Sequence, residues 1–221
     1  TLDLKGALER SCNTYFYTLA LKIGAENVYR YANSFRFGSP LQLGGGIISQ
    51  SVSMPKKETL EQQSAALINL SIGQGELLLS PVAISCMYAA IVNGGSYYQP
   101  YIVEKWESGG SEEYTSKAPP IAAIKKETAD TLSEYLAGAL QNGTGKGAYV
   151  EGIAAGGKTG TAQTGWKDGD RSILNGWFCG YMKGELTDYA IVILKEDVRS
   201  GSADCAPVFK EITEKMHDMG K

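Results

Sequence analysis

Apolar residues recur at helical spacing through much of the first 145 residues of the chain. In the segment 13–23 they fall on one face, and Gly24 follows as a natural left-handed stop. Ser80 and Pro81 mark the start of another helix, because serine caps a helix and proline suits its first turn. The same reasoning predicts further helices over 26–35, 59–70, 81–92 and 126–140.

The hydrophobic period shortens toward the C-terminus. Aromatic and β-branched residues fill 176–181 and 189–194, and the turn-rich stretch between them predicts an antiparallel hairpin. A second strand pair is expected over 101–106 and 113–115, and a helical pattern returns over 207–216. Helices followed by strands predict an α+β fold with an antiparallel sheet, in place of alternating parallel units.

Composition narrows the range of partners. The chain has 221 residues and a formal net charge of −3 at pH 7, which is ordinary for one folded unit. An acidic balance offers no basic surface, so a nucleic-acid partner is disfavoured. Apolar runs are far shorter than the ~18 residues needed to cross a bilayer, so we expect any membrane anchor or signal to lie outside these residues.

The ionisable and sulfur-containing residues exclude several kinds of site. Cys12, Cys86, Cys179 and Cys205 are widely separated without a C-x-x-C pair, so we expect buried free thiols and no metal site. The single histidine, His217, lies in a polar tail, which leaves no material for a Ser-His-Asp triad. Any hydrolytic or acyl-transfer chemistry would therefore need lysine as its base, and no cofactor is indicated.

The stretch 151–165 matches two motifs with unrelated chemistry. Gly152 together with 157–159 spells G-x-x-x-x-G-K-T, the phosphate-binding loop of nucleotide hydrolases. Residues 158–160 alone spell K-T-G, a signature of penicillin-recognising serine enzymes. The flanking residues must decide between them.

A phosphate loop needs a buried strand before it and a helix that begins at its Lys-Thr. The residues before the motif are few and polar-edged, and glycines beyond Thr159 disfavour a helix. In favour of a nucleotide, the apolar run 190–194 is followed by two acidic residues, as in a strand that holds a magnesium carboxylate. The K-T-G alternative predicts an extended strand at the edge of a groove, where Lys158 and Thr159 face an anion and Gly160 permits close approach.

A second short motif lies far upstream, at the entrance of the first predicted helix. Ser11 and Asn13 form an S-x-N, although each residue alone has a simple explanation as a helix cap or turn residue. S-x-N followed by K-T-G is the order that a penicillin-recognising serine enzyme needs.

At this point the chain resembles the transpeptidase domain of penicillin-binding proteins, most closely the monofunctional class B branch. The resemblance runs in order from the first residue to about Phe209. It rests on the landmarks at 11–17, 70–75, 80–81, 93–95, 142–145, 157–163 and 175–178. It implies the fold of penicillin-binding proteins and serine β-lactamases, in which helices cover an antiparallel sheet beside an all-helical subdomain.

The resemblance also implies a mechanism. In this family the serine of an S-x-x-K motif attacks the D-Ala-D-Ala end of a peptidoglycan stem peptide, and β-lactam antibiotics imitate that end. By position, Ser11 would relay a proton, and Asn13 would hold the substrate and the catalytic lysine. Lys158 and Thr159 would bind the terminal carboxylate. Beside Gly160, the Thr161 amide would supply one donor of the oxyanion hole.

The nucleophile of the family is missing from its expected place, because S-x-x-K should precede S-x-N. The string at 53–56 is S-x-x-K but follows Ser11, and Pro55 prevents Ser53 and Lys56 from stacking within a helix. We therefore expect residues 1–221 to be an inactive C-terminal part of one transpeptidase domain, with a helical region at 1–145 and the K-T-G strand, hairpin and last helix at 146–221. The parent enzyme would act on the extracytoplasmic face of the bacterial membrane, anchored by an absent N-terminal segment.

Three alternatives stay open at this stage. A class D β-lactamase or β-lactam sensor shares the short motifs, but the landmarks at 72–75 and 142–145 favour the biosynthetic branch. A non-catalytic wall-binding module would use the groove without a nucleophile. A nucleotide hydrolase comes last. An S-x-x-K in the sequence preceding Thr1 would indicate an acyl-transferase parent, and its absence would favour the binding module.

Overall fold

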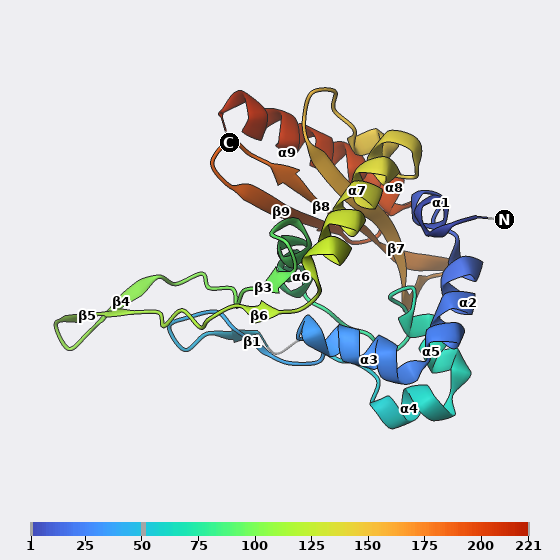
Figure 1. Ribbon diagram of the computed structural model, residues 1–221, viewed down its shortest axis with the longest axis horizontal. Coiled ribbons are helices and arrows are strands. Elements are labelled where there is room, and N and C mark those ends of the chain that lie inside the picture. The colour runs from blue at the N-terminus through green and yellow to red at the C-terminus, as the bar shows by residue number, and fades with distance from the viewer. Residues whose placement is uncertain (1, 50–51, 221) are drawn as a thin grey trace.

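The computed structural model describes residues 2–49 and 52–220, and its helices and antiparallel strands confirm the α+β prediction (Figure 1). Strands β7 (Ala155–Asp168), β8 (Arg171–Lys183) and β9 (Asp188–Lys195) form one antiparallel sheet in that order. The helical segments are α1 (Leu4–Glu9), α2 (Asn13–Ile23), α3 (Ala25–Ser34), α4 (Lys57–Gln62), α5 (Ser64–Leu70), α6 (Pro81–Val92), α7 (Lys126–Asn142), η1 (Lys146–Ala148), α8 (Gly201–Asp204) and α9 (Ala206–Asp218). Short strands pair as β1 (Leu41–Gln42) with β2 (Ile48–Ser49), β3 (Ser96–Tyr97) with β6 (Ile121–Ala122), and β4 (Lys105–Ser108) with β5 (Ser111–Tyr114).

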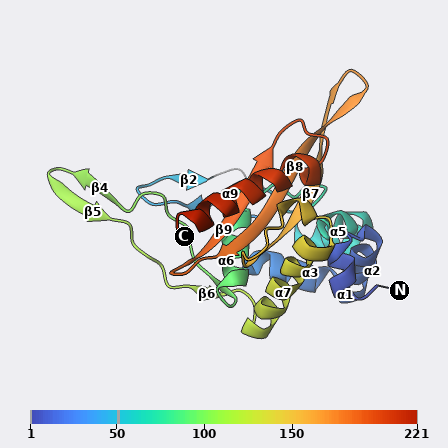
Figure 2. The same ribbon diagram turned by 90° about the horizontal axis from the view of Figure 1, so that it is seen from above.

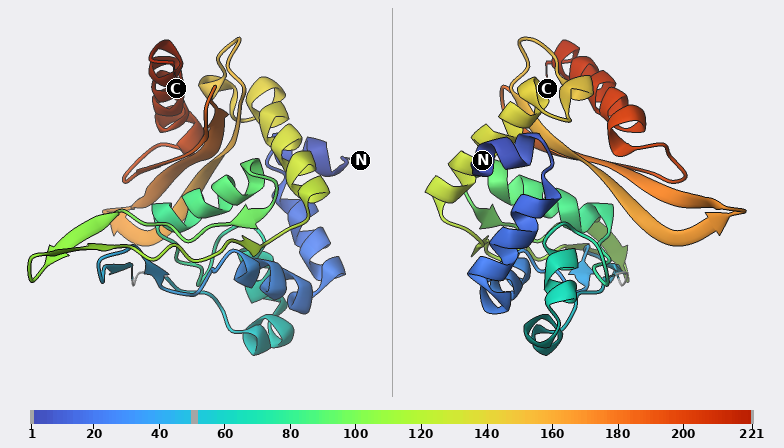
Figure 3. Two further views of the ribbon diagram at one scale, coloured as in Figure 1. Left: turned by 60° about the vertical axis from the view of Figure 1, so that its left-hand side comes forward. Right: turned by 90° about the vertical axis from the view of Figure 1, so that its right-hand side faces the viewer.

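Helices cover both faces of the sheet (Figure 3). On one face Phe178 of β8 packs against Phe209 of α9 with ring centroids 4.3 Å apart, and both side chains are fully buried. Because neighbouring strand residues point to opposite faces, Cys179 meets α6 and α7 on the other side, beside Tyr88 and Leu136. Burying such side chains contributes about 1.5–3 kcal/mol each, so these two layers hold the sheet in place.

Helices α2 to α5 form a separate cluster below the sheet (Figure 1). Helix α2 has the predicted bounds and ends at Gly24, whose φ of 81° is left-handed. The predicted helix over 59–70 is wrong as one element, because Gln63 has an extended backbone (φ −125°, ψ 96°) that separates α4 from α5. Both helices keep the same spacing of apolar residues, so the break cannot be seen in the hydrophobic pattern of the sequence. Leu60 of α4 and Leu67 of α5 pack into the same core.

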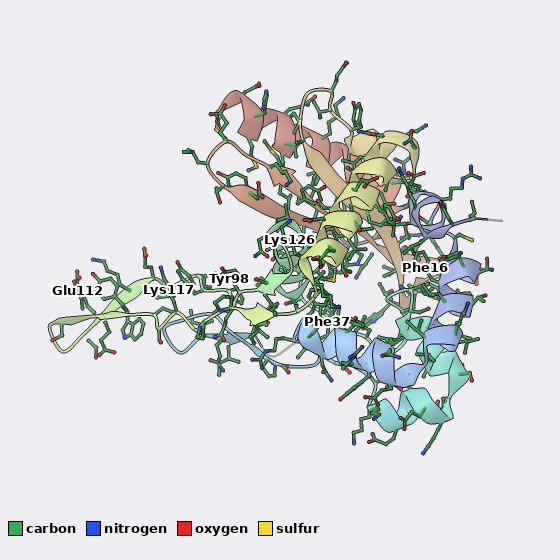
Figure 4. The ribbon with its side chains drawn as sticks, viewed as in Figure 1. Phe16, Phe37, Tyr98, Glu112, Lys117 and Lys126 are labelled. Atoms are coloured by element: carbon green, nitrogen blue, oxygen red, sulfur yellow. The ribbon has the colours of Figure 1, made fainter. Side chains whose placement is uncertain are left out.

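The hairpin β4–β5 projects from the body, with Glu112 and Lys117 far from the sheet (Figure 2, Figure 4). It begins later than predicted because the preceding residues pair elsewhere: the N–H of Ile102 donates to the carbonyl of Leu43 at 2.9 Å. A groove of about 350 Å³ lies at its base, and its lining includes no residue of the S-x-N or K-T-G motifs.

Candidate functional site

Ser11 occupies the junction between two helices, and its backbone is left-handed. Helix α1, which the sequence pattern did not predict, is capped by Asp3, whose carboxylate accepts the Gly6 N–H at 2.8 Å. After α1 the N–H of Cys12 donates to the carbonyl of Ala7 at 2.9 Å, the closing bond of a helix C-terminus that usually places glycine where Ser11 stands. Ser11 has φ of 52°, a region costly for a residue with a Cβ. Ser11 therefore holds a conformation that glycine would adopt without this cost.

The K-T-G motif lies within β7, and the glycines before it serve packing. A Cβ at Gly156 would lie 2.6 Å from the Tyr181 ring, and one at Gly157 would lie 2.7 Å from the Phe178 ring. Aromatic rings from β8 therefore cross β7 on both faces. No helix begins at Thr159, because the strand continues to Asp168, so the phosphate-loop alternative is wrong.

Among the strands of residues 2–49 and 52–220, β7 stands at the end of the sheet order, so one of its edges has no strand neighbour there. The Thr159 carbonyl accepts from Lys158 Nζ at 3.1 Å, and the Gln163 N–H donates to Gln74 Oε1 at 3.4 Å, both on this edge. In an antiparallel strand the N–H and C=O of one residue point to the same edge, and residues alternate. The N–H groups of Thr159, Thr161 and Gln163 consequently point to the free edge.

A cluster of hydroxyl groups joins the two motifs. Lys158 Nζ donates to Ser11 Oγ and, at 2.9 Å, to Thr144 Oγ1. Ser11 Oγ and Thr144 Oγ1 are 3.1 Å apart, and Thr159 Oγ1 donates to Thr144 Oγ1 at 3.0 Å. We call Ser11, Thr144, Lys158 and Thr159 the hydroxyl cluster.

Lys158 is a half-buried cation, and within the described residues it has no carboxylate partner. Among residues 2–49 and 52–220, no ion pair includes it, and its acceptors are hydroxyl and carbonyl oxygens. Burial disfavours the ammonium and lowers the pKa of Lys158 to about 8. A desolvated cation held only by neutral acceptors is suited to attract an anion from outside.

Thr144, to which the sequence analysis assigned no role, lies at the centre of this cluster. Its N–H donates to the carbonyl of Glu9 at 3.1 Å, which ties the turn after α7 to the end of α1. A Cβ at Gly143 would lie 2.3 Å from that same carbonyl oxygen, so only glycine fits there. The landmark at 142–145 was the available signal, but its spacing does not reveal which side chain enters the site.

The remaining predicted site residues lie nearby with separate contacts. Asn13 is the first residue of α2 and is exposed, and the described residues give its side chain no hydrogen-bond partner. Gly160 pairs with Trp177 of β8. Thr161 Oγ1 accepts the Gly201 N–H at 3.0 Å, so its side chain is directed to α8 while its own N–H points to the free edge.

None of the described helices combines the length and apolar character needed to cross a bilayer.

Comparisons with known proteins identify relatives of this chain. The family described as "Penicillin binding protein transpeptidase domain" matches residues 1–214. Stage V sporulation protein D of Bacillus subtilis is 34% identical over 164 residues, which cover 71% of this chain and 24% of that protein. Peptidoglycan D,D-transpeptidase PbpA of Mycobacterium tuberculosis is 28% identical over 221 residues, covering 97% of this chain and 44% of the relative.

Solved structures of penicillin-binding proteins share the fold of this chain. The crystal structure of penicillin-binding protein 3 from Mycobacterium tuberculosis in complex with aztreonam aligns with a TM-score of 0.83 at 26% identity, covering 98% of this chain and 51% of that one. An imipenem acyl-enzyme complex of penicillin-binding protein A from the same organism aligns with a TM-score of 0.79 at 27% identity, over 97% of this chain and 48% of that one. The chain thus spans less than half the length of the two curated relatives. The family model covers residues 1–214, which is almost the whole chain, and the chain belongs to the penicillin-binding protein transpeptidase family.

Proposed function

We propose that the protein containing this chain is a peptidoglycan D,D-transpeptidase that forms a serine acyl-enzyme with stem peptides and is acylated by β-lactams. The observation that carries the proposal is the hydroxyl cluster, in which Ser11 of S-x-N meets Lys158 of K-T-G beside a free strand edge. Relatives named as D,D-transpeptidases and neighbours solved as β-lactam acyl-enzymes support the same chemistry.

Each residue has a role that follows from its place. The charge of Lys158 and the hydroxyl of Thr159 would bind the carboxylate at the D-Ala-D-Ala end, because a charge-assisted contact is about twice as strong as a neutral one. Extended backbone at Gly160 lets the substrate approach the strand. The Thr161 N–H on the free edge is suited to stabilise the oxyanion. Ser11 would pass a proton between the nucleophile and the leaving group, and Asn13 would hold the substrate amide and the catalytic lysine.

The attacking serine is not part of the hydroxyl cluster. Ser53 exchanges backbone hydrogen bonds with Leu78 at 2.9 Å, and in the described chain neither Ser53 nor Lys56 has a hydrogen bond to the cluster. We propose that an S-x-x-K segment outside residues 1–221 supplies the nucleophile, so that these residues are the C-terminal part of one transpeptidase domain. That domain would face the outside of the bacterial membrane, anchored by a further segment.

Labelling of the full-length protein with fluorescent penicillin tests the proposal. We expect one covalent adduct that persists for many minutes, because a transpeptidase awaits an amine acceptor, whereas a β-lactamase releases the adduct by hydrolysis. Lys158→Ala should slow acylation about tenfold or more, since a charge-assisted contact contributes about 1.5–3 kcal/mol. Absence of an adduct in the full-length protein, or unchanged acylation in Lys158→Ala, would contradict the proposal.

A further inference from the structure

We propose that Thr144 is a positioning residue of this site, whose hydroxyl fixes the direction of the Ser11 proton and whose turn joins the S-x-N side of the site to the K-T-G strand. The inference rests on the proposed function and adds a residue that neither short motif contains.

Hydrogen-bond counting assigns the protons of the cluster. A threonine hydroxyl has one donor and two acceptor positions. Thr144 Oγ1 accepts from Lys158 Nζ at 2.9 Å and from Thr159 Oγ1 at 3.0 Å, so both acceptor positions are occupied. Its single proton is left for Ser11 Oγ, which lies 3.1 Å away.

The same counting leaves one proton uncommitted. Ser11 Oγ accepts from Thr144 and from Lys158, which fills its two acceptor positions. The Ser11 O–H is then the only hydroxyl proton of the cluster without an acceptor inside it. Thr144 thereby leaves the Ser11 proton available for donation outside the cluster, as transfer to a leaving group would require.

The backbone around Thr144 holds this arrangement from two sides. Its N–H is bonded to the Glu9 carbonyl at 3.1 Å, and the Gly145 N–H donates to the Ala139 carbonyl at 3.1 Å. The turn is therefore fixed to α1 and to α7 at once. A displacement of Thr144 would move Ser11 and Lys158 relative to each other.

In the part of the chain that the structure describes, the charged side chains near the hydroxyl cluster do not pair with Lys158. The titratable side chains nearest to Ser11 and Thr144 along the chain are Glu9 and Arg10 near the end of α1, Cys12 before α2, and Lys146 of η1. Within the described residues none of the four has a hydrogen bond or ion pair with Lys158. The protonation of Lys158 should accordingly respond to the loss of the Thr144 acceptor.

The test compares Thr144→Val, which keeps the shape and removes the hydroxyl, with Thr144→Ser, which keeps the hydroxyl. Thr131→Val is the matched control, because its hydroxyl on the exposed side of α7 donates to the Glu127 carbonyl at 2.8 Å and has no other hydrogen bond among the described residues. In the full-length protein we expect Thr144→Val to acylate with penicillin about tenfold more slowly, the size expected for one lost hydrogen bond to a charged group. Thr144→Ser and the control should stay within about threefold of the unchanged protein.

A second readout follows Lys158 itself, by the pH dependence of its amine labelling measured by peptide mass spectrometry. Removing an acceptor destabilises the ammonium, so in Thr144→Val the labelling midpoint should fall below the pKa of about 8, while Thr144→Ser should leave it unchanged. If Thr144→Val does not fold, Thr144→Ala replaces it in both measurements.

The outcomes separate this inference from the proposed function. Normal acylation and an unchanged Lys158 midpoint in Thr144→Val would overturn the inference, as would a Thr144→Ser variant as slow as the valine variant. Failure of the unchanged full-length protein to acylate would overturn the proposed function, and the labelling midpoint would still decide whether Thr144 holds Lys158.

Discussion

The Ser11 hydroxyl accepts a hydrogen bond from the Lys158 ammonium, although the two residues are 147 positions apart in the sequence. Ser11 is brought there by the end of α1 and Lys158 by the edge strand of the sheet. The backbone conformation of Ser11 and the burial of Lys158 each lead to a measurable prediction.

The hydroxyl of Ser11 should be needed for acylation, whereas its left-handed backbone should lower the stability of the fold. Ser11→Gly and Ser11→Ala both remove the hydroxyl and should both slow acylation in the full-length protein. They differ in the backbone, because only glycine adopts φ of 52° without strain. We expect the free energy of unfolding of Ser11→Gly to exceed that of Ser11→Ala by about 1 kcal/mol in urea denaturation. A glycine variant less stable than the alanine variant would show that the left-handed position is not strained.

Lys158 should make stability depend on pH in an unusual direction. Burial lowers its pKa from 10.5 to about 8, so between these values the unfolded chain binds more protons than the folded chain. The contribution of Lys158 to the free energy of unfolding should therefore rise as pH increases from 8 to 10.5, on the order of 3 kcal/mol in total. Lys158→Met should lack this rise, whereas the exposed Lys167→Met on the same strand should keep it. Parallel pH profiles for the unchanged chain and Lys158→Met would contradict the lowered pKa.

The same pKa predicts the pH dependence of acylation. If Lys158 binds the carboxylate as an ammonium, the rate of penicillin acylation should fall as pH rises through about 8. Stopped-flow measurement with a chromogenic cephalosporin would follow the decline. A rate that stays level to pH 10 would show that the charge of Lys158 is not required.

Residues 1–221 by themselves should not react with penicillin. The serine and lysine that meet in the cluster, Ser11 and Lys158, belong to S-x-N and K-T-G and not to an S-x-x-K motif, and Ser53 exchanges backbone hydrogen bonds with Leu78. Intact mass measurement after incubation should show no penicilloyl adduct, whereas the full-length protein should gain one. An adduct mapped to Ser53 would place the nucleophile elsewhere than we infer.

Gly143 should tolerate no side chain. Its Cβ would lie 2.3 Å from the Glu9 carbonyl oxygen and 2.8 Å from that of Ala139, so the turn would have to move. Gly143→Ala should lower the free energy of unfolding by about 1–3 kcal/mol and should slow acylation by displacing Thr144. Gly147→Ala is the matched control, because its Cβ would meet the Ala206 Cβ at an ordinary 3.5 Å. Equal thermal stability of the two variants would show that the turn is free to relax.

Elements whose signals are local could be predicted from the amino-acid sequence. Helix α2 runs over 13–23 and α6 over 81–92 as predicted, because caps, proline and glycine act within one or two turns. The hairpin of β8 and β9 was evident from its aromatic and β-branched residues, although both strands extend beyond the predicted runs. The order of the short motifs was enough to indicate the family, which the match over 1–214 confirms.

Other features of the fold and the site depend on contacts between residues that are far apart in the sequence. The hydrophobic pattern along the chain does not reveal the break at Gln63 or the late start of β4. It also does not reveal that two glycines of β7 make room for the rings of Tyr181 and Phe178. The site is the clearest case. Thr144 reaches the cluster because its turn is bonded to Glu9 of α1, which lies near the N-terminus and far from Thr144 in sequence. Periodicity reports only neighbours along one element, whereas a site at the meeting of α1, α7 and β7 is fixed by packing between elements.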